Sequence, residues 1–163
     1  MRQLQSILSL LMVLCLTTNA QAQNNYPSRY DVVIRNGRII DGSGNPWYEA
    51  DVGIVADHIV RIGNLSAAQA DRVVDATGLI VAPGFIDPHT HAMRGIFDVP
   101  TAESSLLQGV TTLTEGNDGS SPYPIDAHYR EIAALGISPN WSVFIGQGTI
   151  REQVIGTEDR AAT

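Results

Sequence analysis

Two different hydrophobic patterns follow one another along the chain, and the first consists of short β-rich runs separated by turn residues. These runs cover residues 31–35 and 38–41 on either side of Asn36-Gly37, 51–55 and 58–62 around Ala56-Asp57, then 72–75 and 79–81. Asn-Gly between apolar runs is a strong hairpin signal, because a type I′ turn needs positive φ at both central residues. We therefore predict two hairpins and two further strands, arranged as a small β-sandwich or barrel.

The second pattern begins after Pro83-Gly84 and alternates between strands and helices. Strands are expected at residues 85–91, 110–114 and 141–145, and helices at 101–108 and 125–135. Thr101 or Ser104 is expected to be the N-cap of the first helix, and Gly109 and Gly136 are expected to end the two helices. This alternation is typical of parallel βα units. Residues 150–163 begin a polar segment to which we assign no element.

Residues 1–22 have the three parts of an export signal. Arg2 supplies a positive charge, residues 7–16 are apolar, and Ala20-Gln21-Ala22 has the small-x-small pattern of a cleavage site. We expect cleavage after Ala22 and a periplasmic or secreted protein; the alternative is a buried N-terminal helix. The only cysteine, Cys15, lies in the signal, so the mature chain should contain no disulfide.

Charge and composition exclude some classes of function. The 163 residues carry a net charge of −7, which gives no electrostatic basis for binding nucleic acid or an anionic membrane surface. All ten basic residues are arginine. Chemistry that depends on a Schiff-base or carbamylated lysine is therefore excluded for these residues. The oligomeric state stays open.

The candidate chemistry lies at the end of the predicted strand 85–91. Side chains alternate across a strand, so Asp87, His89 and His91 should share one face while Thr90 points outward into packing. Two neutral imidazoles one pleat apart can bind one divalent ion, with Zn–N distances of about 2.0–2.1 Å. A pair of hydrogen-bonded structural histidines is the alternative.

Several sequence blocks, taken with these histidines, resemble the amidohydrolase superfamily. They are residues 33–37, 39–42 and 74–91, and the downstream blocks 108–112, 116–119 and 146–151 are similar to the N-acyl-D-amino-acid deacylase branch. The resemblance implies an α/β fold with a β-rich N-terminal part. Residues 23–84 would form part of a β-sandwich domain, and residues 85–163 the first three βα units of an incomplete (β/α)8 barrel. It also implies one or two Zn²⁺ ions, another divalent metal being possible, and a small N-acyl amino acid as substrate.

The resemblance also assigns roles to individual residues. His89 and His91 match the metal-binding pair of the first barrel strand. Asp118 stands where better-known members of the branch have a cysteine ligand, and a carboxylate is a competent zinc ligand. Three possibilities stay open: Asp118 binds the metal, Glu115 does so instead, or neither does. Asp118 could also be a turn residue that stabilises its own loop.

Substrate and catalytic residues are less well defined by the resemblance. Arg94 and Arg151 could each pair with a substrate carboxylate, although surface roles are the common alternative. The family's catalytic Asp belongs to a late barrel strand that is absent from this chain, so no catalytic residue is assigned. We interpret the other histidines, His58 and His128, as surface residues.

The resemblance implies metal-dependent hydrolysis of a non-peptide amide bond, with an N-acyl-D-amino acid as the substrate. One alternative is another amidohydrolase, a cyclic amidase or a dipeptidase. A second is a non-catalytic binding relative or a truncated product. We expect residues 23–163 alone to be inactive and poorly folded, because an open parallel sheet has exposed edges and apolar faces.

Overall fold

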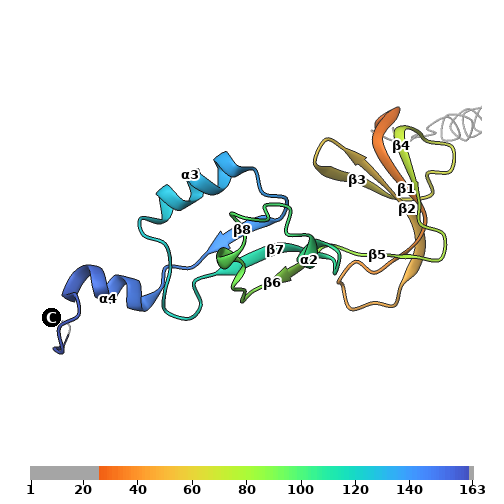
Figure 1. The fold of residues 1–163 in the computed structure, drawn as a ribbon. Helices are drawn as coiled ribbons and strands as arrows, with labels where there is room; N and C mark the ends of the chain where they lie inside the picture. Colours follow the sequence, from red (N-terminus) through yellow and green to blue (C-terminus); the bar gives the residue numbers. More distant parts are fainter. Residues whose placement is uncertain (1–25, 162–163) are drawn as a thin grey trace, which may run out of the picture. The chain divides into compact units, whose positions relative to one another are not determined.

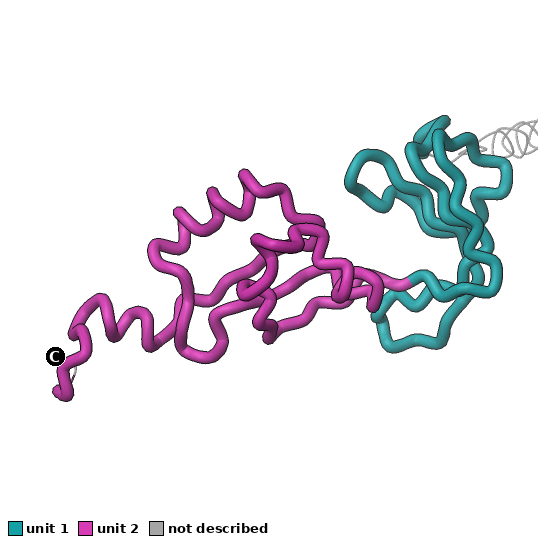
Figure 2. Tube along the Cα trace, in the orientation of Figure 1, with its two compact units in different colours: residues 1–81 teal, residues 82–163 magenta. Residues whose placement is uncertain are grey.

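The computed structural model describes residues 26–161, so the predicted signal at residues 1–22 lies outside the described part. The chain divides into two compact units, residues 1–81 and 82–163 (Figure 2). We place the domain boundary at residue 84 from the sequence, and the structural division falls between Val81 and Ala82.

The first unit is a five-stranded mixed sheet (Figure 1). Its strands are β1 (Arg29–Ile39), β2 (Tyr48–Val55), β3 (His58–Gly63), β4 (Gln69–Asp75) and β5 (Ile80–Val81). The order is β3-β2-β1-β4, and β5 pairs with β1 beyond the end of β4. β2 runs antiparallel to both β1 and β3, whereas β4 and β5 run parallel to β1.

The predicted hairpin at Asn36-Gly37 is wrong. β1 continues through both residues, and its register against β2 shifts between Ile34 and Gly37. Asn36 adopts φ 62°, its N–H donates to Asp51 at 2.9 Å, and its side-chain amide donates to Asp75 at 3.0 Å. Asn36, with its positive φ, therefore forms a bulge at the point where β1 changes partner from β4 to β5. The second predicted hairpin, β2–β3 around Ala56-Asp57, is confirmed.

The second unit has three parallel strands in the order β6-β7-β8 (Figure 1). The strands are β6 (Phe85–Asp87), β7 (Val110–Glu115) and β8 (Asn140–Val143), and the helices are η1 (Ala92–Arg94), α2 (Glu103–Leu106), α3 (Ile125–Leu135) and α4 (Gln147–Ile155). The α/β class with a β-rich N-terminal part is thus confirmed. Within residues 26–161 no helix combines the length and apolarity needed to cross a bilayer.

Several predicted elements of this unit change in length. The strand expected at 85–91 ends at Asp87, since Pro88 has no N–H to continue the ladder. The helix expected at 101–108 shortens to one turn, and its N-cap is Ala102 in the left-handed region rather than Thr101 or Ser104. α4 occupies a segment that the sequence left without an element. α3 has the predicted bounds and ends at Gly136 with φ 72°.

The buried face of α3 corrects our interpretation of His128 as a surface residue. His128 and Ile132 are each only 5% exposed, and Leu113 of β7 is 1% exposed. The indole N–H of Trp141 in β8 donates to His128 Nε2 at 3.0 Å. His128 is therefore a buried hydrogen-bond acceptor between α3 and the sheet. His58, at the start of β3, is exposed as expected.

Candidate metal centre

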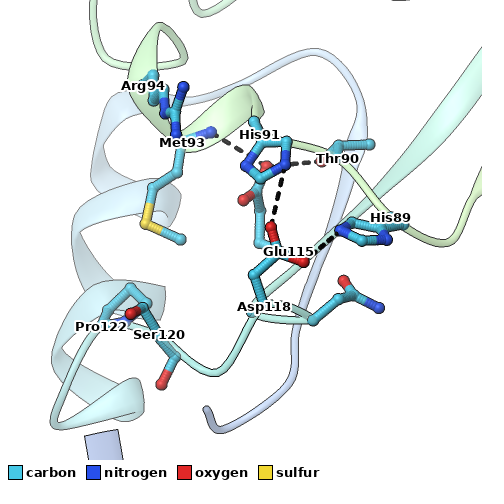
Figure 3. Close-up of a pocket in the computed structure, with 12 residues that line it drawn as sticks. His89, Thr90, His91, Met93, Arg94, Glu115, Asp118, Ser120 and Pro122 are labelled. Carbon is cyan, nitrogen blue, oxygen red and sulfur yellow. Dashed lines mark hydrogen bonds and ion pairs between the residues drawn. The ribbon is translucent and has the colours of Figure 1, made fainter. Parts of the chain in front are cut away.

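Three side chains converge beyond the carboxyl ends of β6 and β7 (Figure 3). His89 Nε2 lies 2.8 Å from one carboxylate oxygen of Asp118, and His91 Nε2 lies 3.2 Å from the other. One potential ligand atom from each residue falls within 4.8 Å of the other two. The carboxyl ends of parallel strands are where α/β proteins commonly build their sites.

The chemistry of these donors fits a divalent ion such as zinc. Two imidazole nitrogens and one carboxylate form a common N/O ligand set, and a catalytic site leaves a fourth position for water or substrate. Ligand atoms of a tetrahedral zinc ion lie about 3.3 Å apart, given bond lengths near 2.0–2.1 Å. The two imidazole nitrogens lie 2.8 and 3.2 Å from different oxygens of Asp118, and one ligand atom from each residue lies within 4.8 Å of the other two, so small side-chain movements would place all three around one ion. The three side chains are 52–56% exposed, so an ion could reach them from solvent.

The histidine segment is held against β7 by the backbone as well as by side chains. After β6 the chain bends, and Asp87 accepts a hydrogen bond from the His89 N–H at 3.2 Å. Asp87 therefore supports the bend and lies outside the convergent group of three. The Thr90 N–H donates to the Thr114 carbonyl at 2.8 Å, and the side chain of Asn117 donates to the Pro88 carbonyl at 3.0 Å.

Glu115, the other predicted ligand, occupies a different position. It is only 4% exposed, and its Oε1 accepts from the Thr90 hydroxyl at 2.6 Å and from the Met93 N–H at 3.1 Å. It does not belong to the group of three potential ligands. Thr90 consequently does not point outward into apolar packing, as the alternation predicted, because the strand ends before it.

The loop that carries Asp118 docks on residues 146–149, which join β8 to α4 and form the first turn of α4. The Gly119 carbonyl accepts from the Thr149 N–H at 3.1 Å, and the Thr149 hydroxyl accepts from the Ser121 N–H at 2.9 Å. The Gly146 N–H donates to the Ser121 hydroxyl at 2.9 Å. Any Cβ on Gly146 or Gly148 would collide with the Gly119 carbonyl. The glycines of this connection thus permit a close backbone approach that fixes the Asp118 loop.

The group of three opens into a cavity of about 690 Å³. Other lining residues include Arg94, Glu115 and the hydroxyl-bearing Ser120 and Ser121. Arg94 is exposed and is the only arginine among the lining residues. Arg151 does not line this cavity; its guanidinium donates to the carbonyls of Glu158 and Arg160 at 2.9 and 3.4 Å.

The environment of His128 between α3 and the sheet changes its acidity. Burial lowers the pKa of His128, and the negative charges of Glu131 and Glu115 oppose this shift. Its Nε2 accepts the Trp141 hydrogen bond, which requires the neutral imidazole. Sequence reasoning missed this residue, although its spacing of four from Ile132 could have placed both on one helix face.

Comparison with known proteins places this geometry in a family. The model of the amidohydrolase family matches residues 72–158. N-acyl-D-glutamate deacylase of Alcaligenes xylosoxydans xylosoxydans is 46% identical over 114 residues, which cover 68% of this chain and 23% of the relative. D-aminoacylase of the same organism is 37% identical over 157 residues, covering 82% and 32%.

A solved structure gives the same result. N-acyl-D-glutamate deacylase from Bordetella bronchiseptica, complexed with zinc and a phosphonate inhibitor that mimics the tetrahedral intermediate, matches with a TM-score of 0.76. The identity is 31%, and the match covers 83% of this chain and 33% of that chain. The chain therefore spans about a third or less of the length of these relatives, and it belongs to the amidohydrolase family.

Proposed function

We propose that this chain forms the N-terminal, metal-binding part of a zinc-dependent hydrolase that deacylates N-acyl-D-amino acids. The observation that carries the proposal is the convergence of His89, His91 and Asp118 at the carboxyl ends of β6 and β7. The relatives named N-acyl-D-glutamate deacylase and D-aminoacylase support the substrate class, and the zinc complex of the Bordetella enzyme supports the metal.

The proposal extends to the architecture. The parallel sheet β6-β7-β8 has the strand–helix alternation with which a (β/α)8 barrel begins. The mixed sheet of β1 to β5 would belong to a β-sandwich. We assign no catalytic acid or base to residues 26–161, and a barrel built of eight units would supply it from a later strand.

His89, His91 and Asp118 would hold a zinc ion. The whole site could hold one or two zinc ions. When bound, zinc polarises an acyl carbonyl and makes water a better nucleophile at neutral pH. The chain's own residues supply the rest of the site: two neutral nitrogens, one negative charge that partly offsets the ion, and a cavity open on the ligand side.

Arg94 is our candidate for binding the substrate carboxylate. It lines the same cavity as the proposed metal ligands, and its planar guanidinium can bind a carboxylate through two parallel hydrogen bonds. Arg151 is the weaker candidate because its guanidinium is engaged with backbone carbonyls near the end of the described chain.

We also propose that the protein is exported. The support is the charged, apolar and small-residue pattern of residues 1–22, with cleavage after Ala22. The site would then work in the periplasm or outside the cell.

We call this chain together with the later barrel units that we propose the full-length chain. The proposal is tested by assaying it on N-acetyl-D-amino acids and their L-enantiomers, before and after removal of metal. We expect hydrolysis of the D-substrates that chelation abolishes and zinc restores. His89→Ala should lower kcat/KM by more than about 100-fold. His58→Ala is the matched control, because His58 is exposed and lies in the other unit.

The same assay separates the alternative functions. Hydrolysis of cyclic amides or dipeptides in place of N-acyl-D-amino acids would favour another amidohydrolase. Equal activity of the chelated protein, or an equal loss in His89→Ala and His58→Ala, would contradict the proposed site. Zinc binding with no hydrolysis of any of these substrates would indicate a non-catalytic relative.

A further inference from the structure

We propose that Glu115 is a positioning residue that holds the histidine segment in place, and that it is not a ligand of the metal. This inference rests on the proposed function, since it concerns how the same metal centre is organised. It assigns a role to a buried carboxylate that the ligand group does not use.

The first argument is where the Glu115 carboxylate points. It leaves the end of β7 and reaches a segment 22 to 25 residues earlier in the sequence (Figure 3). There its Oε1 accepts from the Thr90 hydroxyl at 2.6 Å and from the Met93 N–H at 3.1 Å. One oxygen therefore ties together the two sides of His91.

The second argument is burial. Glu115 is 4% exposed, whereas His89, His91 and Asp118 have side chains that are 52–56% exposed. A buried carboxylate that accepts charge-assisted hydrogen bonds has a defined geometry, and leaving the donors without an acceptor is costly. Glu115 thus has the environment of a structural support, and Asp118 has that of a group accessible to an ion.

The third argument is that the histidine segment lacks a strand ladder of its own. β6 ends at Asp87, so His89 and His91 are not held by strand pairing. Two groups of contacts hold residues 90–93 to the end of β7. The Thr90 N–H and hydroxyl both donate to the Thr114 carbonyl, at 2.8 and 3.1 Å, and the Glu115 carboxylate accepts from Thr90 and Met93. Groups that orient metal ligands typically change metal affinity by about 10- to 100-fold when removed.

Two substitutions at position 115 distinguish a positioning role from a ligand role. Glu115→Gln keeps an oxygen that can accept from Thr90 and Met93 but removes the anionic ligand. Glu115→Leu removes the acceptor altogether. Thr90→Val removes the hydroxyl, which donates to both Glu115 and the Thr114 carbonyl, with little change of shape, and Thr90→Ser keeps this hydroxyl. The Thr90 pair carries the test if Glu115→Leu does not fold.

The experiment measures zinc affinity of the full-length chain by chelator competition, together with the visible spectrum of the Co²⁺-substituted protein. We expect Glu115→Gln and Thr90→Ser to bind within about 3-fold of wild type, and Glu115→Leu and Thr90→Val to bind about 10- to 100-fold more weakly. All four should reach the wild-type metal stoichiometry at saturation. Asp118→Asn is the ligand control and should lose a ligand-dependent part of the Co²⁺ spectrum.

The outcomes separate this inference from the proposed function. If Glu115→Gln loses metal as completely as Asp118→Asn, Glu115 is a ligand and the inference is overturned. If Glu115→Leu and Thr90→Val bind metal as tightly as wild type, the contacts position nothing. If the wild-type chain binds no metal at all, the proposed function fails, and this inference fails with it.

Discussion

At the scale of single residues, Asp118 brings the two histidine rings of an exposed site together. Each imidazole lies against a different oxygen of the one carboxylate, at 2.8 and 3.2 Å. The His89 and His91 rings are consequently directed toward a common point, with their centroids 5.6 Å apart. Little reorganisation is required for an ion to replace these contacts, which favours binding through preorganisation.

Arg94 leads to a prediction about substrate binding. Replacing Arg94 with Ala should raise KM for N-acyl amino acids by about 10- to 100-fold, because a two-hydrogen-bond contact with the substrate carboxylate is lost. The turnover number should change much less, since the carboxylate does not react. Steady-state kinetics of the full-length chain measures both constants.

The control for Arg94 is Arg130→Ala. Arg130 is exposed on α3 and pairs with Asp126 at 2.8 Å, away from the lining of the cavity. The Arg130→Ala variant should have the same KM as wild type. An N-acyl amine without a carboxylate should bind wild type and Arg94→Ala equally, and a KM effect of the same size on that compound would contradict the assignment.

His128 leads to a prediction about stability and pH. Burial lowers its pKa in the folded state, so the unfolded chain binds the proton more readily. The neutral imidazole of His128 contributes its full stabilisation above about pH 6.5, the pKa of histidine in the unfolded chain. This stabilisation is lost as the pH falls from there toward the lower pKa of His128 in the folded state. Thermal melts of the full-length chain should therefore show a falling midpoint below about pH 6.5.

His128→Gln isolates this effect, because the glutamine carbonyl can accept from Trp141 and does not titrate over this range. The variant should show a shallower dependence of the melting midpoint on pH than wild type. Identical slopes in the two proteins would show that His128 does not cause the pH dependence.

At the scale of elements, residues 146–149, which include the first turn of α4, fix the Asp118 loop. Gly148→Ala would place a Cβ 2.8 Å from the Gly119 carbonyl, which is closer than real Cβ contacts allow. The loop must shift, and we expect a loss of about 1–3 kcal/mol in the free energy of unfolding together with weaker zinc binding. Denaturant unfolding of the full-length chain measures the first quantity.

Gly95→Ala is the matched control for Gly148→Ala. Gly95 follows η1, has φ −134°, and an added Cβ there would meet no atom within 4 Å. Its effect should stay within about 0.5 kcal/mol. If Gly95→Ala is as destabilising as Gly148→Ala, the loss in Gly148→Ala does not come from the close approach of α4 to the Asp118 loop.

The elements also show which parts of the fold could be predicted. α3 was predictable to the residue, because its periodicity ends at a glycine that can adopt positive φ. Asn36-Gly37 was not, since the same positive φ serves a bulge as well as a turn, and the choice depends on β4 and β5, which are distant in sequence. His128 was missed because a titratable residue was taken to be exposed, while Trp141 supplies the donor that makes burial possible.

The candidate site, too, could be predicted from the sequence only in part. His89, His91 and Asp118 were singled out from residue type and resemblance, and the structure brings all three together. Their alternation along a strand was the wrong physical reason, because β6 stops at Asp87 and the segment bends. The position of Glu115 depends on side-chain hydrogen bonds across 25 residues, which no local pattern encodes.

At the scale of the whole molecule, the apolar surface of the second unit predicts how the chain behaves by itself. Among residues 26–161, β6 and β8 each pair with one strand only, and Phe85, Ile86 and Leu107 are 62%, 67% and 86% exposed. Unpaired edges beside exposed apolar side chains favour aggregation. Residues 23–163 expressed alone should be insoluble or should melt without cooperativity, as measured by size-exclusion chromatography and thermal unfolding.

The comparison for that prediction is the full-length chain prepared in the same way, which should be soluble and melt cooperatively. A soluble monomer of residues 23–163 with a cooperative melt would show that these surfaces need no cover. The exposed apolar residues would then require another explanation, such as a binding surface.

The central claim of this account is that His89, His91 and Asp118 bind a metal ion. The most direct measurement is an anomalous difference map at the zinc absorption edge from crystals of the full-length chain grown with zinc. We predict a peak about 2.0–2.2 Å from His89 Nε2, His91 Nε2 and a carboxylate oxygen of Asp118. A zinc peak bound by other residues, or no peak near the ends of β6 and β7, would contradict the claim.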